Sequence, residues 1–136
     1  MTDKELIEKA KEAAKNAYVP YSGYTVGAAL LTEDGKVYLG CNIENAAYGP
    51  TNCAERTAFF KAISEGERKF LKIAVVGGKE LHFKDYFAPC GVCRQVMREF
   101  CEDSFIILLG KNGEEYRSIT LSELLPLSFS KNNISD

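Results

Sequence analysis

Two cysteine motifs constrain the fold of this chain more than any other feature. Cys53-Ala54-Glu55 stands where an irregular segment gives way to a helical pattern, and Pro89-Cys90-Gly91-Val92-Cys93 stands at the start of another helical pattern. Together they offer three thiols and one carboxylate that need not be a ligand. Three protein ligands with an open fourth position are typical of a zinc site that holds a water molecule for chemistry. The sequence therefore predicts a site to which the starts of two different helices contribute.

The apolar patterns around these motifs predict an α/β fold. Helices are expected at residues 3–17, 53–65 and 90–100 and briefly after Thr120, and strands at residues 25–32, 37–41, 71–76, 105–109 and 114–119. Strands that alternate with helices indicate a parallel portion with right-handed crossovers, and Asp34-Gly35 indicates a tight antiparallel hairpin. We therefore expect a three-layer α-β-α sandwich with a five-stranded mixed sheet.

Size and composition bound the remaining possibilities. The chain has 136 residues, of which 46% are hydrophobic, and its net charge is −2. One domain at residues 1–129 with a polar C-terminal tail at residues 130–136 fits these values. No basic tract marks a nucleic-acid partner, no apolar run is long enough to cross a membrane, and the charged N-terminus lacks a signal-peptide core. A cytoplasmic location is therefore expected, where cysteine clusters are more often metal-binding or catalytic than disulfide-bonded.

The charges of the predicted site need an explanation of their own. Three thiolates and one Zn²⁺ leave a net charge of −1, which weakens the metal as a Lewis acid. The N-termini of both helices, together with Arg56 and Arg94, can draw charge off the sulfurs through hydrogen bonds. Glu55 cannot easily coordinate the same ion as Cys53, but it can reach a bound water and act as a proton shuttle.

Several simpler interpretations remain open at this point. Glu55 could be the third helical residue of a capping box that begins at Asn52. Cys90 and Cys93 could be buried apolar residues or a redox pair. A structural zinc site with four cysteines is also possible. Cys41 at a strand end could complete it, whereas Cys101 should lie too far along its helix.

The motifs taken together resemble a known family. The residues that carry this resemblance are Pro20-Tyr21-Ser22, Val26-Gly27-Ala28-Ala29, Asn42-Ile43-Glu44-Asn45-Ala46, Cys53-Ala54-Glu55-Arg56, Pro89-Cys90-Gly91-Val92-Cys93-Arg94-Gln95 and Leu124-Leu125-Pro126. In this order and spacing they resemble the small homotetrameric cytidine deaminases, which belong to the zinc-dependent nucleobase deaminases. The resemblance implies hydrolytic deamination of cytidine and 2′-deoxycytidine, with release of ammonia, in pyrimidine salvage. It also implies one zinc ion per chain and active sites at subunit interfaces.

The resemblance also assigns roles to the residues that carry the chemistry. Cys53, Cys90 and Cys93 would bind zinc, and Glu55 would protonate N3 of the pyrimidine and then the departing ammonia. Arg56 would hydrogen-bond the ligand sulfurs.

Further roles concern the substrate. Asn42 and Glu44 would hold the ribose 3′-hydroxyl, the backbone around Ala54 would contact the base, and Tyr24 would flank the base or sugar, where the family often has phenylalanine. The remaining contacts, expected from a neighbouring subunit, are Ala46, Tyr48 and Phe129. Without the resemblance, Phe129 would be interpreted as a core anchor. The alternative functions are a deaminase for a nucleoside antibiotic of the blasticidin S type and a structural zinc module.

Overall fold

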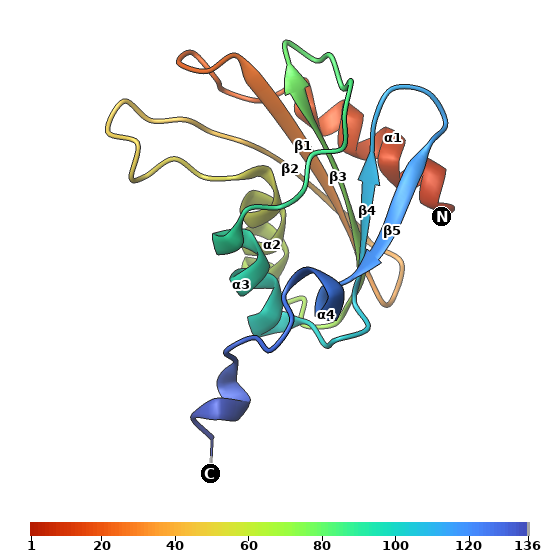
Figure 1. The fold of residues 1–136 in the computed structure, drawn as a ribbon, viewed down its shortest axis with the longest axis vertical. Coiled ribbons are helices and arrows are strands. Elements are labelled where there is room, and N and C mark those ends of the chain that lie inside the picture. Colours follow the sequence, from red (N-terminus) through yellow and green to blue (C-terminus); the bar gives the residue numbers. More distant parts are fainter. Residues whose placement is uncertain (136) are drawn as a thin grey trace.

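The computed structural model describes residues 1–135 and confirms the five-stranded mixed sheet (Figure 1). The strands lie in the order β2-β1-β3-β4-β5, and β3 and β4 pair in parallel while the other neighbours pair antiparallel. The strands are β1 (Tyr24–Thr32), β2 (Val37–Cys41), β3 (Phe70–Lys79), β4 (Ile106–Gly110) and β5 (Tyr116–Thr120). The helices are α1 (Asp3–Ala14), α2 (Ala54–Ser64), α3 (Gly91–Phe100) and α4 (Leu121–Leu124), followed by a 3₁₀ turn at Lys131–Asn133.

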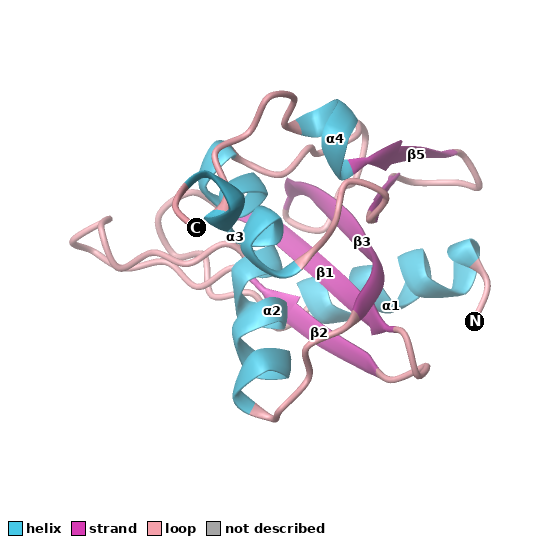
Figure 2. Ribbon diagram, turned by 90° about the horizontal axis from the view of Figure 1, so that it is seen from below, coloured by secondary structure: helices cyan, strands magenta, loops and turns pink. Residues whose placement is uncertain are grey.

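The sheet lies between α1 on one face and α2 and α3 on the other (Figure 2). A hydrophobic core fills the space on each side of the sheet. Successive residues of a strand point to opposite faces, so Leu30 of β1 joins the core beneath α2 and α3, and Leu31 joins the core beneath α1. Leu121 of α4 belongs to the same core as α2 and α3. The helices that begin at the two cysteine motifs therefore cover the same face of the sheet.

The first helix is shorter than its apolar pattern predicts. The capping box between Thr2 and Glu5 is present, but α1 ends at Ala14 rather than at residue 17. The chain leaves the helix because Tyr18 joins the segment after β2: its N–H donates to the carbonyl oxygen of Asn42 at 3.0 Å, and its carbonyl accepts from the N–H of Glu44 at 2.9 Å. A tertiary contact thus overrides local helix preference.

The third strand is longer than predicted. It continues through Gly77 and Gly78 to Lys79, whereas the sequence predicts that the glycines end it. A Cβ atom at Gly77 would lie 2.5 Å from the ring of Phe87, and one at Gly78 would lie 2.0 Å from the carbonyl oxygen of His82. The two glycines are therefore strand residues that let the loop after β3 fold back closely on the sheet.

A single glycine governs how closely α2 approaches the sheet. A Cβ atom at Gly40 of β2 would lie 2.4 Å from the carbonyl oxygen of Ala54 and 2.5 Å from the N–H nitrogen of Ala58. Both are backbone atoms of α2, so a side chain here would push the helix away from the sheet. Because α2 follows Cys53 and carries Glu55, this close approach positions the predicted site.

We expect Gly40→Ala to lower the free energy of unfolding by about 1–3 kcal/mol, the usual cost of overpacking a close contact. Denaturant unfolding checks this value. Gly91→Ala is the matched control, because a Cβ built there meets no other part of the chain within 4 Å beyond its neighbours and its own helix backbone. If the two variants have the same free energy of unfolding, the close packing of α2 on the sheet does not depend on Gly40.

The predicted polar tail contains ordered structure. The 3₁₀ turn at Lys131–Asn133 has a capping box in which the Ser130 hydroxyl accepts the N–H of Asn132 at 3.2 Å. Asp136 lies outside the described residues. Within residues 1–135, no helix has the length and apolar character needed to cross a bilayer.

Candidate active site

The structure brings Cys53, Cys90 and Cys93 into one cluster. Cys53 and Cys90 are the N-cap residues of α2 and α3, and Cys93 lies in the first turn of α3. The three sulfur atoms all lie within 4.8 Å of one another, and Cys53 Sγ and Cys90 Sγ are 3.7 Å apart. A disulfide would need about 2.05 Å. Tetrahedral zinc with bonds of about 2.3 Å places its sulfurs about 3.8 Å apart, so the spacing fits zinc.

The cluster contains three ligands among the residues that the structure describes, not four. Cys101 is the C-cap residue of α3, at the opposite end of the helix from Cys90, and Cys41 ends β2. Neither joins the three sulfurs, nor does a histidine or carboxylate within residues 1–135. A tetrahedral ion held here would keep its fourth position for water or substrate, which is the arrangement of a catalytic rather than a structural zinc site.

Hydrogen bonds within this cluster favour a thiolate at Cys53. Those from Cys93, Arg56 and Cys90 lower the pKa of the Cys53 thiol to about 5, because they stabilise its charged form. The pKa of Cys93 is raised, because it hydrogen-bonds Cys53 and is buried. Arg56 takes the predicted position, with Nη2 donating to Cys53 Sγ at 3.2 Å.

The prediction that Arg94 also draws charge off the sulfurs is wrong. Its guanidinium binds backbone carbonyl oxygens instead: Nε donates to Pro89 at 2.8 Å and Nη1 donates to Leu124 at 2.7 Å. Its role is therefore to connect segments of the chain, and the compensation of thiolate charge falls to Arg56 and the two helix N-termini.

Glu55 is a buried carboxyl group in the first turn of α2. Only 2% of its surface is exposed, and burial raises its pKa to about 7. It also interacts electrostatically with Cys53 and Cys93, which places it beside the sulfur cluster. A carboxyl group with a pKa near 7 can both accept and donate a proton at neutral pH.

The alternative interpretation of Glu55 as a helix-capping residue is wrong. The N-cap residue of α2 is Cys53, and it receives no side-chain capping bond. The side chain of Asn52 instead donates from Nδ2 to the Thr57 hydroxyl at 3.1 Å. The burial of Glu55 is thus not explained by the start of the helix.

The raised pKa of Glu55 predicts a specific pH dependence of stability in the zinc-free protein. The group ordinarily titrates at 4.5 and titrates at about 7 in the fold. The contribution of this group to stability is therefore fully present below pH 4.5 and is lost as the pH rises towards 7, because the carboxyl ionises in the unfolded chain while burial keeps it protonated in the fold. Glutamine does not titrate. Between pH 5 and pH 8, the wild type should therefore lose about 2–3 kcal/mol relative to Glu55→Gln.

Denaturant unfolding of chelator-treated protein at the two pH values measures this difference. Glu12→Gln, on the surface of α1, should follow the wild type at both pH values. A difference between Glu55→Gln and the wild type that stays constant with pH would show that burial does not raise the pKa of Glu55.

The side chains of Asn42 and Glu44, the predicted ribose contacts, form hydrogen bonds with backbone groups of the chain itself. Asn42 Oδ1 accepts from the N–H of Val26 at 2.9 Å, and its Nδ2 donates to the carbonyl oxygen of Tyr24 at 2.8 Å. Glu44 Oε1 accepts from the N–H groups of Tyr21 at 3.0 Å and Ser22 at 3.1 Å. Each side chain keeps hydrogen-bonding capacity for a ligand, and these bonds fix its orientation.

The residues predicted to contact a neighbouring subunit are exposed. Ala46 and Tyr48 lie in the long loop between β2 and α2, which projects from the body of the molecule in Figure 1. Tyr48 is 74% exposed and Phe129 is 62% exposed. The interpretation of Phe129 as a core anchor is therefore wrong. Tyr24 is also exposed, whereas Ala54 is fully buried directly after Cys53.

Three further residues shape this site, and the sequence motifs do not predict their roles. Ser22 donates its hydroxyl to Glu44 and so orients the carboxylate. Thr57 donates its hydroxyl to the carbonyl oxygen of Cys53 at 3.2 Å. Gly40 has no side chain and so allows α2 to pack closely on the sheet. An isolated glycine inside a strand pattern is a usable signal of close backbone approach, whereas serine and threonine partners have no such signal.

Comparisons with known proteins agree with this geometry. Residues 1–109 match the family described as "Cytidine and deoxycytidylate deaminase zinc-binding region". A cytidine deaminase from Sporosarcina psychrophila is 51% identical over 135 residues, which cover 99% of this chain and 96% of that protein. The crystal structure of cytidine deaminase from Burkholderia pseudomallei superposes with a TM-score of 0.88 at 49% identity, covering 95% of this chain and 100% of that one.

Similarity to an antibiotic deaminase is weaker. A blasticidin-S deaminase from Bacillus cereus is 32% identical over 134 residues, which cover 96% of this chain and 94% of that protein. The cysteine cluster, whose spacing suits zinc, lies within the matched zinc-binding region. From the extent of that match and the full-length similarity, the chain belongs to the cytidine and deoxycytidylate deaminase family.

Proposed function

We propose that this protein is a zinc-dependent cytidine deaminase, which hydrolyses cytidine and 2′-deoxycytidine to uridine and 2′-deoxyuridine with release of ammonia. One observation carries the proposal: three cysteine sulfurs spaced for zinc lie beside a buried glutamate that is not among the ligands. Similarity to cytidine deaminases over almost the whole chain supports the choice of substrate.

Glu55 performs the proton transfers of the reaction. Bound zinc supplies a water molecule that ionises near neutral pH. In the overall reaction, oxygen from water replaces the amine at C4, and the C4–N bond breaks. Glu55 takes one proton from the water and passes it to N3. It then takes the second proton from the oxygen that has bonded to C4 and passes it to the amine, which leaves as ammonia. A pKa of about 7 suits both directions of transfer.

Asn42 and Glu44 bind the ribose in this proposal, with the 3′-hydroxyl as their main contact. The hydrogen bonds that they make to Val26, Ser22 and neighbouring backbone groups hold both side chains in place before substrate arrives. Tyr24 flanks the base or sugar. The backbone around Ala54 contacts the base, since it lies between a zinc ligand and the proton shuttle.

The working enzyme is proposed to be a homotetramer in the cytoplasm that serves pyrimidine salvage. In this assembly Ala46, Tyr48 and Phe129 of one subunit reach the active site of another, and their exposure in a single chain supports that assignment. Five free cysteines suit a reducing compartment.

The test is a spectroscopic assay of purified protein with cytidine, run beside a measurement of zinc content. The pyrimidine spectrum changes when the exocyclic amine becomes a carbonyl. A change with cytidine and one zinc per chain supports the proposal. If the spectrum changes with neither cytidine nor 2′-deoxycytidine while zinc is bound, the proposed function is rejected. Turnover of blasticidin S would then identify the protein as an antibiotic deaminase instead.

A further inference from the structure

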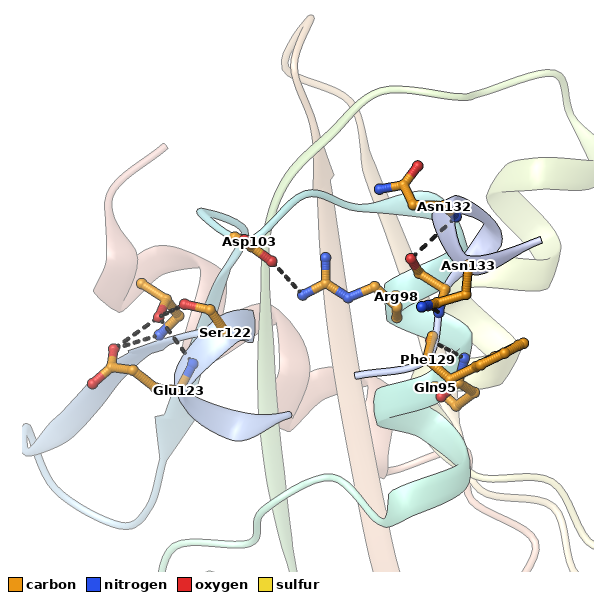
Figure 3. Close-up of polar contacts among 10 residues, drawn as sticks. Gln95, Arg98, Asp103, Ser122, Glu123, Phe129, Asn132 and Asn133 are labelled. Carbon is orange, nitrogen blue, oxygen red and sulfur yellow. Dashed lines mark hydrogen bonds and ion pairs between the residues drawn. The ribbon is translucent and has the colours of Figure 1, made fainter. Parts of the chain in front are cut away.

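The helix that carries Cys90 and Cys93 also holds the end of the chain. Directly after Cys93, Arg94 donates to the carbonyl oxygen of Leu124 at 2.7 Å. Gln95 Nε2 donates to the carbonyl oxygen of Phe129 at 2.9 Å (Figure 3). These two bonds attach both ends of residues 124–129, here called the C-terminal segment, to the first turns of α3.

Arg94 connects the C-terminal segment to the zinc site itself. While its Nη1 binds Leu124, its Nε binds the carbonyl oxygen of Pro89, the residue immediately before Cys90. A guanidinium group is planar and rigid, so the two carbonyl groups are held at fixed positions relative to each other. Pro89, just before Cys90, and Leu124, at the end of α4, are therefore held next to each other by one side chain.

Leu124 and Leu125 pack against the core beneath α2 and α3, but the four residues after them are mostly exposed. Leu127 is fully exposed and adopts a left-handed backbone with φ of 51°, which is unfavourable for a residue other than glycine. The ring of Phe129 is also mostly exposed. Since little side-chain packing holds residues 126–129, the bonds from Arg94 and Gln95 fix the backbone that carries the ring of Phe129.

We propose that Arg94 and Gln95 are positioning residues that fix Phe129 relative to the zinc-binding helix. The inference rests on the proposed function, in which Phe129 contacts substrate in a neighbouring subunit. It explains why Cys93-Arg94-Gln95 and Leu124-Leu125-Pro126, which are far apart in sequence, occur in one chain: the first motif binds the segment that the second begins. The helix that holds the metal thereby also sets the position of a substrate contact.

The first test measures the kinetics of Gln95→Ala with cytidine. Losing one hydrogen bond to a positioning contact should raise KM about 3- to 10-fold, with kcat changed less than about twofold and zinc content unchanged. Gln95→Lys, which restores a donor, should recover most of the loss, and Gln95→Glu, which cannot donate, should not. Asn16→Ala is the matched control, because Asn16 is exposed and its side-chain amide makes no hydrogen bond within the described chain.

A double-mutant cycle tests whether Gln95 acts through Phe129. If it does, Gln95→Ala should add nothing to the KM of Phe129→Ala, because the contact that it positions is already lost. Additive increases in KM would overturn the proposal, and so would an unchanged KM in Gln95→Ala when Phe129→Ala raises it.

Limited proteolysis separates failure of this proposal from failure of the proposed function. Trypsin cleavage after exposed Lys131 should be faster in Arg94→Ala and Gln95→Ala than in the wild type. It should be unchanged in Arg117→Ala, an exposed arginine whose side chain makes no hydrogen bond within the described chain. Unchanged cleavage in the first two variants overturns the proposal whatever the activity. If cleavage is faster in both variants but the wild type deaminates neither cytidine nor 2′-deoxycytidine, only the proposed function is rejected, because the attachment of the segment by Arg94 and Gln95 still holds.

Discussion

Glu55→Gln should lower the turnover of cytidine by about 10²- to 10⁴-fold, the range that general acid–base catalysis contributes. Glutamine has nearly the same shape as glutamate and fills the same buried position beside the sulfur cluster. It cannot accept the proton that water gives up, nor deliver one to N3 or to the departing amine. The loss should therefore appear in kcat, because proton transfer belongs to the chemical step rather than to binding.

Zinc content must be measured in the same preparations, since loss of the metal would mimic loss of the shuttle. Glu55 is not among the three ligands, so the variant should keep one zinc ion per chain. Glu12→Gln, an exposed substitution on α1, should leave turnover and zinc content unchanged. If zinc-loaded Glu55→Gln turns over cytidine at a rate near that of the wild type, Glu55 is not the proton shuttle.

The pH-dependent stability and the proton-transfer role predicted for Glu55 have the same cause. Burial removes water from the carboxyl group, which raises its pKa and destabilises the zinc-free fold at neutral pH. The same raised pKa suits a group that must accept and release protons near pH 7. A residue that mainly capped a helix would stabilise the fold, so the expected gain in stability on substitution distinguishes the catalytic interpretation from the structural one.

The sulfur cluster could be predicted from sequence because local signals determine it. Each cysteine motif stands where an irregular segment gives way to a helical apolar pattern, which is a short-range signal. The alternation of strands and helices then brought α2 and α3 to one face of the sheet. Element boundaries were less predictable. The end of α1 depends on the bonds between Tyr18 and the segment after β2, which no local pattern reveals.

The partners of long polar side chains could not be predicted, because they depend on tertiary geometry. Arg56 and Arg94 each follow a cysteine ligand, yet only Arg56 contacts a sulfur, while Arg94 reaches the carbonyl of Leu124. Asn42 and Glu44 were predictable as a polar pair in a loop. That they bind the backbone of Val26 and Ser22 was not, because those segments lie about 20 residues earlier in the chain.

The five cysteines of the chain should divide into two groups when each is replaced by serine. Cys53→Ser, Cys90→Ser and Cys93→Ser should each lose zinc and activity, because each removes one of three sulfurs that lie within 4.8 Å of one another. The loss of zinc affinity should exceed the 10- to 100-fold that follows removal of a residue that only orients a ligand. Cys41→Ser and Cys101→Ser should keep one zinc ion per chain, because neither sulfur joins the cluster.

Competition with a zinc-binding dye measures these affinities, and cytidine turnover is recorded in parallel. The two groups distinguish a catalytic site from a structural one. With three sulfur ligands, the fourth position is free for water, and only the three clustered cysteines matter for zinc. Loss of zinc from Cys41→Ser would instead show a fourth sulfur ligand and a closed site, since a saturated tetrahedral ion has no position for the water that deamination requires. The burial of Cys101 at the far end of α3 raises its pKa to about 12, so its thiol stays protonated at neutral pH and is a poor metal ligand there.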